Sequence, residues 1–563
     1  MKRISPNRPG RYWILLWMLV LPIGMYGQSE LEPVTRTYAL TNVNIVQAPG
    51  RKIDLGTVLV KDGLIISVGK NVSIPPEAMI IRADSMYVYA GFIDGLSRTG
   101  VTRPKEETNR ERPKDPGNPS NERAGITPNT DVRNLLNPSD KAIEDWRGAG
   151  FTLANVVPYG GMLPGQAALI LLSGRTADDL VMQTNTGLYS ELTGASGVYP
   201  NTVIGVMAKW RDLYRKAVNS KNYEALYASN RNGLERPMSD RVYEPFFPVI
   251  DQKIPVIFKA EKLLDVQRVL TLKNDLRFPL ILAEVKEGWH AIPKIKATGS
   301  KVFLSLDLPE EIKKEEKKND QKTEEKPKTP GEIEKEQLEK RRNEAIASYT
   351  AQAATFQKAG IVFGFSLLNT KPKDVHTNLR RMISAGLSED AALAALTTSP
   401  AQLLGMSDRV GTIDPGKMAN LVVSDKPFFS EKAKIRYVFV DGVLTKLEVK
   451  ENKKTDASVK SEIEGTWNTT TQSPQGTTTG KVVFKKEGGG YSGNISSSMS
   501  QETMALKDIT LEGNTLSYKY TLSFGGRSVE VETNVTIEGD SFKGNTSVGT
   551  FGSFPIEGSK NPK

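Results

Sequence analysis

Few side chains of this 563-residue chain are placed where they could do acid–base chemistry, and the candidates are Asp94, Lys259, Glu284 and His290. Lys259 and Glu284 each stand at the end of an apolar run, so they could form a buried ion pair, or Lys259 could bind an anionic group of a substrate. His290 stands at an expected helix start, where an acid–base role and a structural role are both open. His376, the other histidine, precedes an expected helix and is predicted to be a surface or capping residue.

Several other kinds of chemistry lack the residues they need. The chain has no cysteine, which excludes disulfides, a cysteine nucleophile and a lipid-modified N-terminal cysteine. Gly160 and Gly161 form a glycine-rich turn, but the lysine of a phosphate-binding loop does not follow them. No spacing of serine, histidine and aspartate indicates a catalytic triad.

The elements that must position the candidates alternate between strand and helix. Continuous apolar runs predict buried parallel strands, and polar–apolar stretches between them predict helices. This alternation predicts an α/β fold with a (β/α)8 TIM-like barrel, in which Lys259 and the glycine-rich loop 159–166 lie at the carboxyl-terminal face that carries active sites. The expected strands are 151–158, 254–260, 279–284 and 301–306, and the expected helices are 140–150 and 262–273.

Two segments resemble the amidohydrolase superfamily. Residues 87–98 (YVYAGFIDGLSR) resemble the family's first barrel strand, V-x-P-G-x-I-D-x-H-x-H. Residues 380–444, with AGLSEDAAL, ALTTSPAQLLG, VGTIDPGKMANLVV and VFVDG in that order, resemble its C-terminal signature. The resemblance covers about residues 36–445 and is nearest to the imidazolonepropionase-like branch.

The resemblance implies a catalytic zinc or other divalent metal, but the positions of its ligands are changed. Leu96 and Arg98 stand where the family has its first two histidines, Lys259 where a middle histidine is common, and Ser366 where a late aspartate binds. Leucine and arginine cannot ligate a divalent metal, because a ligand must offer a lone pair in deprotonated form. We therefore expect no metal cofactor. Asp94 is retained, and in the family it mainly supports the strand end.

The resemblance also predicts a small β-sandwich built from both ends of the barrel. Residues 56–69 indicate a hairpin turned at Asp62–Gly63. Two polar segments within the barrel are expected to be exposed insertions, the second of them helical or disordered. The expected ranges are 36–90 and 405–445 for the sandwich, 91–404 for the barrel, and 102–131 and 309–345 for the insertions.

A second domain is expected after a polar linker, 446–462. Residues 463–563 are rich in Gly, Ser and Thr and alternate in polarity, which predicts a small all-β barrel or sandwich. Gly465-Thr-Trp467 resembles the opening of lipocalin-like barrels, and a simple core tryptophan is the alternative.

The N-terminus predicts export. Residues 1–27 combine a basic start with a short apolar run, as in a cleaved signal peptide, so we expect a periplasmic or secreted protein without a membrane span. The net charge of +10 is spread over polar tracts and indicates solvation, with no pattern typical of nucleic-acid binding.

Three functional readings remain open at this point. The first is a catalytically inactive amidohydrolase homologue that binds a small-molecule ligand or a partner, such as a metal-competent relative or a second copy in a homodimer. The second is an active hydrolase of non-peptide C–N bonds in small amides or lactams. The third is an envelope binding protein in which the C-terminal β-domain carries the function.

Overall fold

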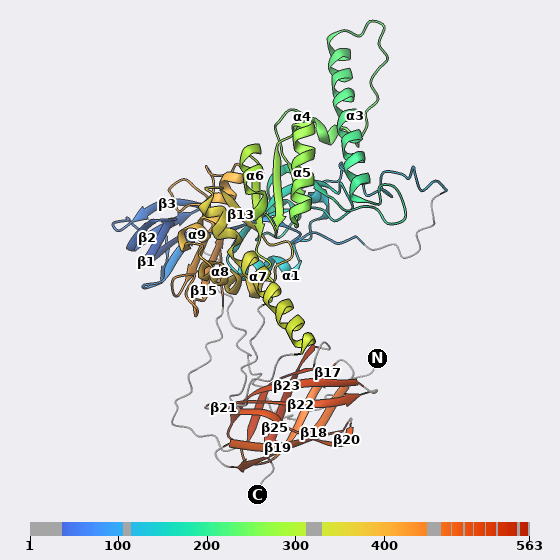
Figure 1. Ribbon diagram of the computed structural model, residues 1–563. Coiled ribbons are helices and arrows are strands. Elements are labelled where there is room, and N and C mark those ends of the chain that lie inside the picture. Colours follow the sequence, from blue (N-terminus) through green and yellow to red (C-terminus); the bar gives the residue numbers. More distant parts are fainter. Residues whose placement is uncertain are drawn as a thin grey trace, which may run out of the picture. The chain divides into compact units, whose positions relative to one another are not determined.

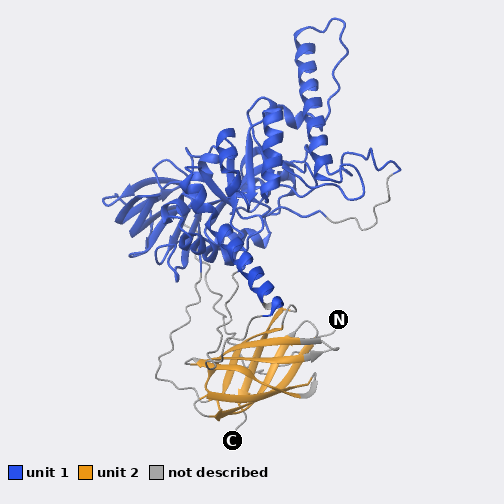
Figure 2. Cartoon of the chain, viewed as in Figure 1, with its two compact units in different colours: residues 1–448 blue, residues 449–563 orange. Residues whose placement is uncertain are grey.

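The computed structural model describes residues 36–104, 114–310, 329–447 and 463–560, the last range with short gaps at 474–475, 488–489, 499, 513, 525–526 and 549–551. The chain forms two compact units, residues 1–448 and residues 449–563 (Figure 2). The predicted signal peptide 1–27 lies outside the described residues, as do most of the linker (448–462) and parts of both insertions (105–113 and 311–328). No helix in the described ranges is both long and apolar enough to cross a membrane.

The first sheet of unit 1 joins strands from far apart in the sequence. Its order is β16-β15-β14-β5-β1-β2-β3, with β4 paired in parallel to β1. Ala90 of β5 pairs with Leu421 of β14, which ties the two ends of the unit together. The hairpin predicted at Asp62–Gly63 is confirmed, since both turn residues have positive φ and β2 pairs antiparallel with β3. The strands are β1 (Thr37–Ala48), β2 (Arg51–Lys61), β3 (Leu64–Gly69), β4 (Met79–Arg82), β5 (Tyr87–Ala90), β14 (Leu421–Ser424), β15 (Ile435–Val440) and β16 (Val443–Lys446).

The second sheet is the barrel. Its eight strands follow the order β13-β12-β11-β10-β9-β8-β7-β6, and its end strands are joined by a hydrogen bond from Leu367 N to Leu96 O, 3.3 Å. The strands predicted around 151–158, 254–260, 279–284 and 301–306 are all confirmed. Their bounds are β6 (Phe92–Ser97), β7 (Phe151–Val156), β8 (Gly165–Leu171), β9 (Val181–Glu191), β10 (Val256–Lys259), β11 (Leu280–Val285), β12 (Lys301–Ser305) and β13 (Phe363–Ser366).

One strand departs from the predicted parallel alternation. β8 pairs antiparallel with both β7 and β9, whereas all the other neighbours in this sheet are parallel. The prediction of a regular (β/α)8 pattern was therefore wrong here. The physical reason is the short connection 157–164, because a parallel crossover requires about a dozen residues and usually a helix.

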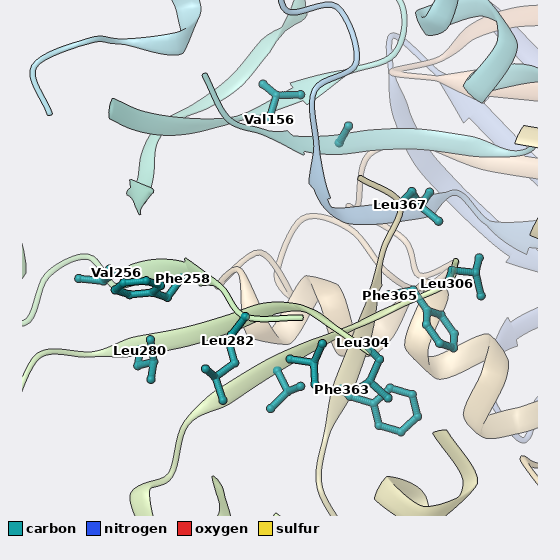
Figure 3. Close-up of a cluster of buried hydrophobic side chains, with 14 of the residues drawn as sticks. Val156, Val256, Phe258, Leu280, Leu282, Leu304, Leu306, Phe363, Phe365 and Leu367 are labelled. Carbon is teal, nitrogen blue, oxygen red and sulfur yellow. The ribbon is translucent and has the colours of Figure 1, made fainter. Parts of the chain in front are cut away.

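The barrel strands pack on both faces, and their side chains alternate between them. Ile257 and Phe303 face the barrel interior, where Phe303 fills the space beside two glycines: a Cβ on Gly95 would lie 2.1 Å from its ring, and one on Gly364 would lie 2.6 Å from it. The alternate residues face outward and form an apolar layer, of which Val256, Phe258, Leu280, Leu282, Leu304, Phe363 and Phe365 are visible in Figure 3.

Helices cover the outer face of most barrel strands. The predicted helices at 140–150 and 262–273 are confirmed as α1 and α5, and α5 buries Val266, Val269 and Leu270, whose spacing places them on one face. The long helix α3 buries only residues of its first half, and Figure 1 shows the remainder extending away from the rest of unit 1. The helices are α1 (Lys141–Gly148), α2 (Ala177–Leu180), α3 (Val203–Ser229), α4 (Phe247–Ile250), α5 (Leu263–Leu276), α6 (Ile292–Thr298), α7 (Pro330–Lys358), α8 (Val375–Ser384), α9 (Glu389–Leu396) and α10 (Thr398–Leu403), with short 3-10 turns η1 (Val132–Leu135), η2 (Glu244–Phe246), η3 (Trp289–Ala291) and η4 (Pro372–Asp374).

Unit 2 is an all-β domain, as predicted for residues 463–563. Its nine strands pair antiparallel in the order β20-β19-β18-β17-β25-β24-β23-β22-β21 and form a barrel-like sheet (Figure 1). Trp467 is fully buried in the core, where its Nε1 donates to Ile463 O at 2.9 Å and its ring packs on Phe542. The strands are β17 (Gly465–Ser473), β18 (Gly476–Glu487), β19 (Gly490–Ser497), β20 (Ser500–Ala505), β21 (Lys507–Glu512), β22 (Thr515–Phe524), β23 (Arg527–Glu538), β24 (Ser541–Val548) and β25 (Gly552–Lys560).

Candidate active site at the barrel mouth

Leu96 and Arg98 come from the end of β6 and are two residues apart, so both side chains point to the same face of the strand. Leu96 is fully buried and belongs to the apolar cluster inside the barrel, together with Ile257 and Phe303. Arg98 lies one step further along, where the barrel opens. The first of the two positions is therefore part of the core, and the second carries a cation.

Charged side chains at the ends of β6, β9, β10, β11 and β12 form ion pairs in which positive and negative charges alternate. We call this set the mouth ion-pair chain, and its members are Arg98, Glu191, Lys259, Glu261, Lys286 and Asp307. Each member is at least partly shielded from water, with side-chain exposures from 9% for Glu191 to 38% for Asp307. Because positive and negative side chains alternate in this network, their charges balance one another.

The first half of the mouth ion-pair chain centres on Glu191. Arg98 Nη2 donates to Glu191 Oε1 at 2.7 Å, and Lys259 Nζ lies 3.8 Å from the other carboxylate oxygen. The Tyr189 hydroxyl also donates to Glu191 Oε1, at 2.8 Å, and burial raises the pKa of this hydroxyl well above its usual range. Arg98 stacks on Tyr159, with its guanidinium carbon 4.5 Å from the ring centroid.

The second half continues over the next strands. Lys259 Nζ lies 2.9 Å from Glu261 Oε1, and Lys286 Nζ lies 3.8 Å from Glu261 Oε2. Lys286 then donates to Asp307 Oδ2 at 2.6 Å. The expected pairing of Lys259 with Glu284 was therefore wrong, because Lys259 finds two nearer carboxylates, Glu191 and Glu261.

Glu284 is directed elsewhere, toward the β13 side of the barrel. Its φ of +58° is unusual for a residue other than glycine, and it coincides with a register shift between β11 and β12. Its carboxylate accepts hydrogen bonds from Ser305 Oγ (2.7 Å), Ser366 Oγ (2.5 Å) and Asn369 Nδ2 (3.1 Å). Burial raises the pKa of Glu284, an effect that the two serine hydrogen bonds oppose.

Asp94 and the two histidines lie outside the mouth ion-pair chain. Asp94 Oδ1 accepts from Leu96 N (3.0 Å) and Leu367 N (3.1 Å), so it joins β6 to β13, and burial raises its pKa well above the usual range. His376 Nε2 lies 2.8 Å from Phe428 O, and its ring packs edge-on against the Phe428 ring. His290 is exposed in η3.

The side chains at the four former ligand positions do not fit a divalent metal. Leu96 has no atom that could ligate a metal, and Arg98 and Lys259 are cations already paired with carboxylates. The hydroxyl of Ser366 donates a hydrogen bond to Glu284. Over the ranges that the structure describes, no three or more His, Cys, Asp or Glu side chains are grouped as a metal site requires.

A cavity with a volume of about 360 Å³ lies beside β8 and η2. Glu244 is its one carboxylate. Its lining is Asn129, Gln166, Asn185, Arg241, Glu244, Pro245 and Pro248.

Sequence reasoning missed Tyr159 and four of the six members of the mouth ion-pair chain: Glu191, Glu261, Lys286 and Asp307. A signal for them exists, because each of these charged residues stands at the end of a barrel strand or within two positions after it: Glu191 ends β9, and Glu261, Lys286 and Asp307 follow β10, β11 and β12. A check of the charged residues at the end of every strand would have found them.

The comparisons with known proteins identify the fold. Residues 357–445 match the amidohydrolase family. An amidohydrolase from Thermotoga maritima MSB8 has a similar structure, with a TM-score of 0.58 at 21% sequence identity over 72% of this chain and 99% of that one. Unit 1 therefore shares the fold of this amidohydrolase, with a TIM barrel, and the family match is to residues 357–445 of that unit.

Two further solved structures have a lower similarity to this chain. A Xaa-Pro dipeptidase with bound methionine in its active site gives a TM-score of 0.40 at 11% identity, over 73% of this chain and 100% of that one. Molinate hydrolase gives 0.38 at 14% identity, over 73% of this chain and 95% of that one. No curated protein matches the sequence.

Proposed function

We propose that this chain is an amidohydrolase-superfamily protein of the imidazolonepropionase-like branch that binds a ligand or a partner without metal-dependent hydrolysis. The observation that carries the proposal is the 2.7 Å ion pair of Arg98 with Glu191 at the end of β6, where relatives would bind their metal. The burial of Leu96 in the barrel core supports it, because a side chain packed there contributes no lone pair.

Electrostatics supports the same conclusion. A divalent metal near Arg98 and Lys259 would face two fixed positive charges, and two unit charges 4 Å apart repel by about 4 kcal/mol at the effective dielectric typical of such sites. Glu191 is the carboxylate that both cations already contact. The mouth ion-pair chain thus takes the place that a metal and its ligands would need.

The alternative is a hydrolase of non-peptide C–N bonds in small amides or lactams. Glu284, a buried carboxyl with a raised pKa, is the group best suited to act as a general acid there. It is, however, fully buried and holds three hydrogen bonds, so a substrate could reach it only after Ser305, Ser366 or Asn369 moved. We therefore treat hydrolysis as the outcome that would overturn the proposal.

The proposal includes a location and a partner class, both supported by the sequence. The basic and apolar pattern of residues 1–27 supports export to the periplasm or the exterior. A metal-competent amidohydrolase relative, or a second copy of this chain, is the partner class that suits a companion subunit, and a small molecule is the ligand class that suits a barrel mouth.

The test is the metal content of protein purified without chelator and then incubated with zinc. We expect less than about a tenth of an equivalent of zinc, because the deprotonated ligands that metal binding requires are absent. A metal-containing amidohydrolase treated in parallel is the control, and circular dichroism confirms folding. Near-stoichiometric zinc together with hydrolysis of small amides or lactams would contradict the proposal.

A further inference from the structure

Two guanidinium groups meet at one aromatic ring beside the barrel mouth. The guanidinium carbon of Arg98 lies 4.5 Å from the centroid of the Tyr159 ring, and that of Arg103 lies 5.8 Å from the same centroid. Arg103 is exposed, whereas the Arg98 side chain is 23% exposed. An anion bound beside this ring would lie near both cations and be attracted to each of them.

Arg98 has hydrogen-bonding capacity that its protein contacts leave unused. Its Nη2 donates to Glu191, but its Nε is buried and has no hydrogen-bond partner within the described part of the chain. A buried donor without a partner is costly. An oxyanion that reaches this edge of the guanidinium would satisfy the donor.

We propose that the barrel mouth binds a small ligand through its carboxylate group, which is held by Arg98 beside Tyr159 with Arg103 as the second cation. The planar guanidinium fork matches a carboxylate, which can accept two parallel hydrogen bonds. This inference rests on the proposed function, because it requires Arg98 to serve an organic anion at the position where relatives place a metal ligand.

The site favours a singly charged carboxylate over a phosphate. The Glu191 carboxylate, only 9% exposed, lies 2.7 Å from Arg98 Nη2. A dianionic phosphate would meet about twice the repulsion from Glu191 but also about twice the attraction to the guanidinium groups, so the preference comes from Tyr159, whose ring offers an apolar face to the organic part of a carboxylate ligand. The ligand therefore competes with Glu191 for Arg98, and this competition predicts that removal of the Glu191 carboxylate strengthens ligand binding.

The experiment is ligand-observed NMR titration of the full chain with benzoate, with benzamide as the neutral analogue of nearly the same shape, and with inorganic phosphate. We expect benzoate to bind at least about tenfold more tightly than benzamide, since a charge-assisted hydrogen bond has about this effect. Arg98→Met should weaken benzoate binding by about tenfold or more on the same grounds.

Two further variants keep the test decisive. Arg211→Met is the matched control, because Arg211 is also ion-paired and similarly exposed (28%) but joins α3 to Asp275 on the outside of the barrel, so benzoate binding should not change. Glu191→Gln removes the competing carboxylate and should tighten benzoate binding, a gain that a variant with a merely damaged fold would not produce.

Several results would overturn the inference. They are equal binding of benzoate and benzamide, benzoate binding that Arg98→Met or Glu191→Gln leaves unchanged, or tighter binding of phosphate than of benzoate. Repeating the titration with zinc distinguishes a failure of the proposed carboxylate site from a failure of the proposed function. Benzoate binding that appears only with zinc and survives Arg98→Met would refute both, whereas no benzoate binding in a protein that also binds no zinc refutes the carboxylate site alone.

Discussion

The ion pair between Arg98 and Glu191 should be energetically coupled, and a double-mutant cycle measures this directly. The four proteins are the parent, Arg98→Met, Glu191→Gln and the double variant. Methionine retains the apolar stem of arginine, and glutamine retains an acceptor for the Tyr189 hydroxyl, which donates to Glu191 at 2.8 Å. The cycle then isolates the interaction between the two charges.

The magnitude follows from burial and from the remaining partners. The two side chains are 23% and 9% exposed, so the pair is neither a surface salt bridge nor fully desolvated. Each single variant leaves one charge without its closest partner and should cost about 1.5–2.5 kcal/mol of unfolding free energy. The double variant should cost about as much as one single variant, which gives a coupling energy of about 1.5–2.5 kcal/mol.

Urea unfolding followed by tryptophan fluorescence is the assay. In a Trp467→Phe background the emission reports on unit 1, because Trp467 is the single tryptophan of residues 449–563. The matched cycle uses Arg211 and Asp275, which are 28% and 40% exposed and should couple by about 0.2–1 kcal/mol, as surface pairs do. A coupling for Arg98 and Glu191 no larger than in this control would refute the reasoning that the partial burial of this pair strengthens its interaction.

Two further predictions concern the barrel interior. Burial raises the pKa of Glu284, so the folded protein keeps a proton that the unfolded chain loses near pH 4.3. This group therefore stabilises the fold most below about pH 4.3, and its contribution is lost as the pH rises through the folded-state pKa. Glu284→Gln should therefore flatten the decrease in Tm between acidic and neutral pH, and an unchanged pH profile would contradict this assignment. Gly95→Ala should destabilise unit 1 by about 1–3 kcal/mol, since its Cβ would lie 2.1 Å from the Phe303 ring. Adding Phe303→Leu should recover part of that loss, and failure of this rescue would show that the contact is not the cause.

Much of the fold was predictable because burial leaves a repeating pattern in the sequence. The apolar runs at 254–260, 279–284 and 301–306 became β10, β11 and β12, and the hairpin at Asp62–Gly63 formed as predicted. The strand β8 was not among the predicted strands, and its antiparallel direction was missed with it because an apolar run does not record direction. Only the length of the connection before β8 carries that information.

The sequence by itself determined which residues stand at the former metal positions, since Leu96, Arg98, Lys259 and Ser366 are read directly from the chain and their side chains lack the chemistry of metal ligands. It did not determine how the charges pair. Lys259 has carboxylates within reach on neighbouring strands, and the tertiary structure placed it against Glu261 and Glu191. Glu284 lies instead with Ser366, which follows it by 82 positions. The physical reason is that pairing depends on distances between strands and on the left-handed backbone at Glu284, neither of which a one-dimensional pattern contains.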